Sequence, residues 1–74
     1  MTKKEWIKQL NRWMEQADIT GARNFREQIH QKIFAFAQER PSDHEAKEVL
    51  ATFTPEKLSI PRQMVLGVIR SAME

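Results

Sequence analysis

Side chains that could act as bases or metal ligands are few in this sequence. Its 74 residues contain two histidines and no cysteine, so His30 and His44 are the only natural bases near neutral pH. His44 and Glu48 stand four residues apart, which on a helix places two metal-ligating groups side by side. A metal site needs three or four ligands, so we expect no metal here. We interpret His44 as a solvated residue in the first turn of a helix.

Nucleophilic catalysis needs a hydroxyl, a thiol or an amine beside an activating base. One helical turn from His30 lies Phe34, rather than a serine or a carboxylate, and we expect His30 to be half-buried on the flank of its helix. The sequence also has no glycine-rich loop of the kind that holds phosphates. We therefore predict a protein that is not an enzyme and that binds no cofactor.

Basic side chains offer a different chemistry, the contact with phosphate groups. Three of them recur at four-residue spacing near the N-terminus and so share one helix face, but Glu5 and Glu15 stand beside them. The formal net charge of the chain is only +2, well below that of a dedicated nucleic-acid binder. A mixed-charge solvated face and a nucleic-acid-binding surface both remain open, and the second is our alternative hypothesis. Its residues would be Lys4, Lys8, Arg12, Arg23 and Arg26.

Apolar residues at helical spacing indicate the elements that position these groups. The strongest pattern lies between Ala22 and Ala37, where apolar side chains follow the spacing of an amphipathic helix. No segment shows the two-residue alternation of a strand, and no internal repeat or long linker divides the chain. We predict an all-α, bundle-like single domain over residues 1–74. Its four helices are expected at about residues 3–17, 21–39, 43–52 and 61–73, with a short helical turn at about 55–58.

Local signals mark where these helices begin and end. Thr2-Lys3-Lys4-Glu5 and Ser42-Asp43-His44-Glu45 are capping boxes, in which hydroxyl and carboxylate side chains satisfy the first free N–H groups. Asp18 or Thr20 is expected to cap the second helix, and Pro41 ends it because the residue before a proline avoids the helical conformation. The later starts are marked by Thr54-Pro55 and by Pro61.

The composition, with 41% hydrophobic and 30% charged residues, is that of an ordinary globular protein. Without cysteine no disulfide can form, so stability has to come from buried apolar area. No apolar run approaches the roughly 18 residues that cross a bilayer, and the N-terminal segment does not resemble a secretion signal. We expect no contact with a membrane and, as the default, a cytoplasmic location.

More apolar side chains are present than one core face per helix requires. Phe34 projects about 135° from the centre of the core face of its helix, and the last helix is apolar over roughly half its circumference. On the narrow polar side of that last helix, Gly67 and Ser71 leave room for another helix. Trp6 and Trp13 share one face of the first helix, either as core anchors or as the lining of a partner groove.

Two interpretations of this apolar surplus remain open. Either the packing buries the last helix centrally and covers Phe34 with the helix over residues 43–52, or these side chains form an exposed contact surface. Our leading hypothesis is the second. It describes a small, non-enzymatic helical adaptor or regulatory protein that binds another protein, or a second copy of itself as a homodimer, around the last helix. The residues expected to bind are Phe34, Met64, Leu66 and Met73.

Overall fold

Five α-helices and one turn of 3₁₀ helix make up the chain in the computed structural model, which describes residues 1–74. No strand is present, so the predicted all-α class is confirmed. The predicted count of four helices is slightly off, because the segment expected as one helix over residues 21–39 is divided in two. The elements are α1 (Lys3–Thr20), α2 (Ala22–Gln28), α3 (His30–Gln38), α4 (Asp43–Ala51), η1 (Pro55–Lys57) and α5 (Ile60–Met73).

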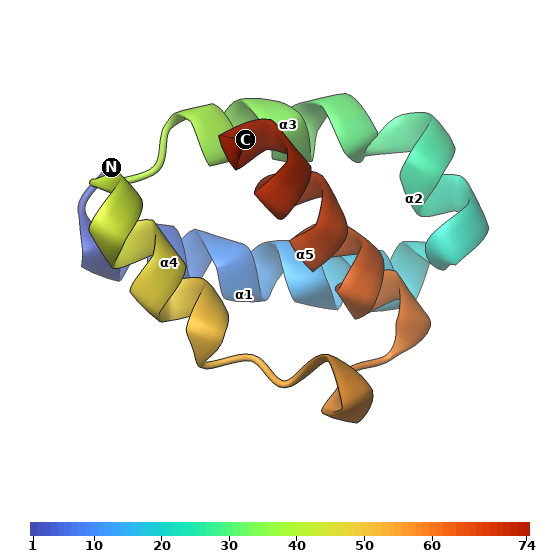
Figure 1. The fold of residues 1–74 in the computed structure, drawn as a ribbon. Helices are drawn as coiled ribbons and strands as arrows, with labels where there is room; N and C mark the ends of the chain where they lie inside the picture. The colour runs from blue at the N-terminus through green and yellow to red at the C-terminus, as the bar shows by residue number, and fades with distance from the viewer.

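The last helix, α5, lies at the centre of the arrangement (Figure 1). It packs chiefly on α3 and α1, and its N-terminal end lies near α2. α4 lies beside the N-terminal part of α1, at the end of the molecule away from α2. The principal axes measure 30 × 24 × 22 Å, so the helices form a compact globule. None of them combines the length and the apolar character that crossing a membrane requires.

Fifteen buried residues form one hydrophobic cluster, and none of them is polar. Trp6 is fully buried, and its ring stacks on that of Phe36 with 5.1 Å between the ring centroids. The indole N–H of Trp6 donates to the carbonyl oxygen of Phe36 at 3.4 Å. Trp13 is partly buried and lies against the same phenylalanine, with 6.4 Å between the centroids. Both tryptophans are therefore engaged with the core.

The division between α2 and α3 is a bend rather than a break. Ile29, at the junction, has φ −112° and ψ −18°. Its N–H nevertheless donates to the carbonyl of Phe25 at 3.0 Å, and its carbonyl accepts from the N–H of Ile33 at 3.1 Å. All three side chains are buried, so the apolar stripe predicted for this segment is kept. The bend lets both helices pack on α5.

Both predicted capping boxes are present. The hydroxyl of Thr2 accepts from the backbone N–H of Glu5 at 3.2 Å and donates to its carboxylate at 2.9 Å. Ser42 and Glu45 make the same pair of contacts, both at 3.2 Å. Each box satisfies an N–H group that the start of a helix leaves free, and such a cap typically contributes about 1 kcal/mol to stability.

The prediction of a side-chain cap for the second helix is wrong. Thr20 belongs to the last turn of α1, and α2 begins after Gly21, which offers no capping side chain. Gly21 has φ 84° and ψ 154°, a conformation that residues with a Cβ atom rarely adopt. The sharp reversal between α1 and α2 therefore depends on this glycine. Thr54 likewise makes no side-chain cap on η1.

Asp18, the other residue expected to cap the second helix, instead joins the end of α1 to the start of α5. Its carboxylate accepts from the hydroxyl of Ser59 at 2.5 Å and from Nε of Arg62 at 2.6 Å. The same hydroxyl accepts from the backbone N–H of Arg62 at 3.3 Å and so caps α5. We call Asp18, Ser59 and Arg62 the α1–α5 latch. The hydrogen bond from Ser59, followed by the one from Arg62, lowers the pKa of Asp18.

The latch predicts a dependence of stability on pH in the acidic range. Because the pKa of Asp18 is lower in the folded chain, its contribution is fully present above the unfolded value of about 4 and is lost as the pH falls through the lower folded value. Asp43 and Glu48, whose pKa values are also lowered, add to this decline. Urea denaturation of Asp18→Asn should show lower stability at neutral pH and a shallower acid decline than the unchanged chain. Identical pH profiles for the two proteins would contradict the latch.

Candidate functional site

A groove of about 300 Å³ lies between the α2–α3 segment and α5. One wall comes from α2 and α3, and the other comes from α5. Phe25, whose side chain is fully buried in the core, forms part of the floor. We name this feature the α3–α5 groove, and it is lined by Phe25, Arg26, His30, Phe34, Met64, Gly67, Val68 and Ser71.

The helical repeat explains why these residues share one groove. Arg26, His30 and Phe34 recur every four residues, and the helical hydrogen bonds continue across the bend, so the three form a single row. On α5, Met64 and Val68 are four residues apart and belong to one helix face. Each wall is therefore one continuous face of a helical segment.

Gly67 keeps the α5 wall open. No atom lies within 4 Å of the position that a Cβ atom would take there, so this chain does not fill the space beside the helix backbone. How closely two helices approach depends on the side chains at their contact. Gly67 and the small residue Ser71 on the same wall therefore give a second helix access to the backbone of α5.

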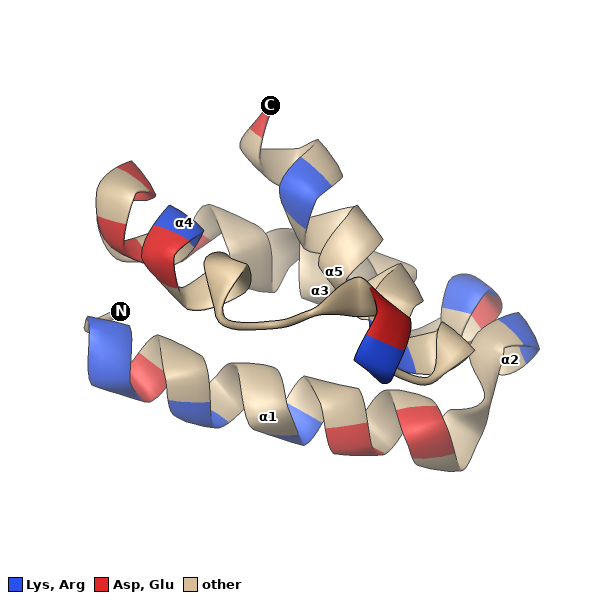
Figure 2. Cartoon of the chain, turned by 60° about the horizontal axis from the view of Figure 1, so that its bottom comes forward, with Lys and Arg blue, Asp and Glu red and all other residues tan.

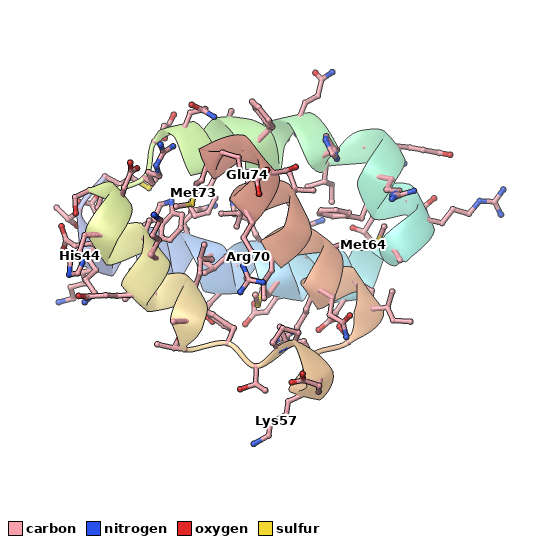
Figure 3. The ribbon with its side chains drawn as sticks, viewed as in Figure 1. His44, Lys57, Met64, Arg70, Met73 and Glu74 are labelled. Atoms are coloured by element: carbon pink, nitrogen blue, oxygen red, sulfur yellow. The ribbon has the colours of Figure 1, made fainter.

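The apolar side chains around the groove are only partly covered. Phe34 is 44% exposed, so the packing in which the helix over residues 43–52 covers it is not the one observed. Met64 and Val68 are partly buried where they pack against the core. Figure 3 shows Met64 on the side of α5 that faces α2. The groove thus offers apolar side chains from both of its walls.

The apolar strip continues beyond the groove toward the start of α5. Ile60 is 68% exposed and stands four residues before Met64, so the two share one helix face. Ile19, at the end of α1, is 84% exposed. The α1–α5 latch holds these two helix ends together, so both isoleucines lie at the same end of the molecule.

The structure separates the four residues that were expected to bind a partner. Phe34 and Met64 line the same groove. Leu66 is only 2% exposed and belongs to the core, so it does not offer the surface expected of it. The reason is that α5 is surrounded by its neighbours, chiefly α3 and α1, so more of its apolar face is buried than the sequence indicates.

Met73, the fourth of these residues, lies outside the α3–α5 groove. It is partly buried and lines a second hollow of about 470 Å³ between α4 and α5. Figure 3 shows it at the C-terminal end of α5, in the part of the helix that also carries Arg70 and Glu74. Met73 and Phe34 therefore line different hollows.

The rim of the α3–α5 groove carries the positive charge of Arg26, and His30 stands one helical turn further on. Both side chains are exposed, and neither forms a salt bridge. None of the lining residues is acidic. His30 was expected to be half-buried, and the structure corrects this, because it points away from the core residues of its helix and into the groove rim.

The cations of the alternative hypothesis do not gather in one patch. Lys4, Lys8 and Arg12 are exposed along α1 and form no salt bridge. Figure 2 shows basic segments, with an acidic segment among them, from the N-terminal end to the middle of α1, then acidic segments toward its C-terminal end, and the basic segments of α2 beyond these. A helix of 18 residues is about 27 Å long, so Arg23 and Arg26 lie far from the start of the row.

A small cluster of titratable side chains lies where α4 meets the start of α1. Glu48 accepts from Nζ of Lys3 at 3.0 Å, and its other oxygen lies 2.7 Å from Nε2 of His44. The hydrogen bond and the charge of Lys3, ahead of the charge of His44, lower the pKa of Glu48. His44 is 84% exposed, as predicted for a solvated residue in a first helical turn. No group of three or more His, Cys, Asp or Glu side chains could hold a metal ion.

Comparison of the chain with family models, with curated proteins and with solved structures finds no match. Its function therefore has to be inferred from its surface. The α3–α5 groove is the surface feature that brings together an exposed aromatic ring, an unfilled glycine face and the unpaired guanidinium of Arg26.

Substitutions at Phe34 and Leu66 should show by their effect on stability that Phe34 is a surface residue and Leu66 a core residue. Phe34→Glu is expected to lower the free energy of unfolding by at most about 1 kcal/mol, because the ring is already half-exposed. Leu66→Ala should lose about 2–5 kcal/mol through the cavity that it leaves in the core. Urea denaturation of both variants measures the difference, and equal losses would show that Phe34 is a core residue.

Filling the open face at Gly67 should stabilise the fold. Gly67 lies inside α5, does not have a positive φ, and has free space where a Cβ would stand. Gly67→Ala is expected to raise the free energy of unfolding by about 0.5–1 kcal/mol, since alanine favours a helix more than glycine does. Thermal denaturation measures this as a higher midpoint. A lower midpoint would mean that the face is already occupied in the isolated protein.

Proposed function

We propose that this chain is a small, non-enzymatic helical adaptor or regulatory protein that binds another protein through the α3–α5 groove. The main support is the half-exposed ring of Phe34 beside an open groove with apolar side chains on both walls. Exposed apolar surface of this kind favours a contact site. Aromatic side chains in such sites also carry much of the free energy of binding.

Core packing accounts for neither Phe34 nor Gly67. Phe34 lies on the side of its helix away from the buried residues Ile33, Phe36 and Ala37. A glycine inside a helix lowers stability by about 0.5–1 kcal/mol relative to alanine, and no neighbouring atom requires its small size at position 67. A partner seated in the groove accounts for both residues, because it would cover the ring and approach the bare backbone.

Affinity capture with groove variants tests this proposal. Wild-type protein, Phe34→Glu and Gly67→Leu are immobilised in parallel, together with Ile7→Glu. Ile7 is 36% exposed on α1, outside the groove, so Ile7→Glu controls for a new charge at a partly apolar surface position. We expect one or more proteins to be retained by wild type and Ile7→Glu but lost by both groove variants. Calorimetry with a purified captured protein should then show the same order of affinity among the four chains.

Circular dichroism first establishes that all four proteins are folded. Equal retention of every captured protein by the four, or loss with Ile7→Glu alone, would contradict binding through the groove. A wild-type chain that sediments as a dimer, and a Gly67→Leu chain that sediments as a monomer, would show that the occupant is a second copy of this chain.

Nucleic-acid binding through α1 is the alternative, favoured by the three exposed cations without salt-bridge partners on that helix. If Lys4, Lys8 and Arg12 each contact a phosphate, log K should fall with log salt concentration with a slope of roughly −2 to −3. Fluorescence anisotropy with a labelled duplex and a labelled single strand at low salt measures this. Binding that is absent, or that a Lys4→Glu and Lys8→Glu double variant leaves unchanged, rules out the alternative.

A further inference from the structure

We infer that the occupant of the α3–α5 groove is an amphipathic α-helix that carries carboxylates beside its apolar residues. This inference rests on the proposed function and adds the chemistry of the partner. It follows from the shape of the two walls, from the open backbone at Gly67 and from the charge of the rim.

The walls have the form and length that a helix fits. Peptides bind proteins mainly as added strands, as polyproline segments or as helices in grooves, and this all-helical chain offers no sheet edge for an added strand. The α5 wall from Met64 to Ser71 is about 10 Å long, and it reaches about 16 Å when Ile60 is included. A partner helix of two to three turns would therefore lie along it, with apolar residues spaced i, i+4 and i+7.

Gly67 favours a helix over a single inserted side chain. Helix axes pack about 8–10 Å apart, and the shorter distances need small residues at the contact. A Cβ at position 67 would meet no atom of this chain, so backbone of a partner can lie there. Phe34 on the opposite wall, 44% exposed, would then close over the partner's apolar face.

The charge of the groove rim indicates which charge the partner carries. Arg26 and His30 line the groove, and Arg23 stands one turn before Arg26, exposed and without a salt bridge. Glu27, the nearest acidic residue along α2, is not part of the lining. A carboxylate next to the partner's apolar residues would gain a charge-assisted hydrogen bond from the guanidinium of Arg26.

The same charge argues against a second copy of this chain as the occupant. In a two-fold interface the same surface meets itself. In such a dimer the rim of one copy would lie against the rim of the other, so the unpaired guanidinium of Arg26 would meet a lining that has no acidic residue to offset it. Opposite charges across an interface favour association, and like charges oppose it. An acidic partner is therefore favoured over self-association.

A displayed library of helical peptides tests the inference. Each peptide carries leucine at i, i+4 and i+7, and its other positions are randomised among Ala, Gln, Lys and Glu. Selection is carried out on wild type, Arg26→Glu, Gly67→Leu and Arg12→Glu. Arg12 is exposed and unpaired on α1, outside the groove, so Arg12→Glu changes the net charge by the same amount as Arg26→Glu.

We expect wild type and Arg12→Glu to enrich peptides with Glu beside the leucines, and Gly67→Leu to lose them. Arg26→Glu should bind those peptides at least about tenfold more weakly, as expected when a charge-assisted hydrogen bond becomes a repulsion, and should enrich Lys instead. Peptides that Gly67→Leu rejects but that show no preference for Glu would overturn the inference and leave the proposed function intact. If neither this selection nor the affinity capture yields any ligand that Gly67→Leu rejects, then both the inference and the proposed function are wrong.

Discussion

The whole arrangement depends on the burial of α5 between α1 and α3. Val65 and Ile69 of α5 are fully buried, and polar contacts hold both ends of the helix. The α1–α5 latch fixes its start, and the side-chain amide of Gln38 donates to the carbonyl of Ala72 at 3.0 Å near its end. Because these neighbours cover only part of the helix circumference, one face stays open, and that face carries Gly67 and Ser71.

The α3–α5 groove is a consequence of this packing. The bend at Ile29 keeps α2 and α3 against α5 while their outer row, from Arg26 to Phe34, remains at the surface. For the isolated fold, a half-exposed phenylalanine and a helical glycine are both less favourable than common alternatives. Residues that lower the stability of the isolated fold are expected at sites that serve a contact, which is why we propose this groove as the contact surface.

Local signals in the sequence predicted the parts of the fold that depend on neighbours along the chain. The capping boxes and the apolar stripes follow from three-residue and four-residue spacing. The bend at Ile29 was not predictable, because no proline or glycine interrupts the pattern there. The role of Asp18 depends on a contact with Ser59, 41 residues away. The burial of Leu66 depends on which helices surround α5, which a single helix cannot reveal.

The candidate site was predictable in part for the same reason. The helical position of Phe34 marked it as lying off the core face, and the structure brings it together with Met64. Arg26 and His30 at the rim become part of the site only when two distant segments meet.

The central claim, a groove open to solvent beside an enclosed α5, is most directly tested by NMR with a soluble paramagnetic probe. We predict strong broadening of the Phe34 ring, the Met64 methyl and the Gly67 amide signals, and little broadening of the Leu66 and Ile69 methyl signals. Equal protection of all five would contradict it.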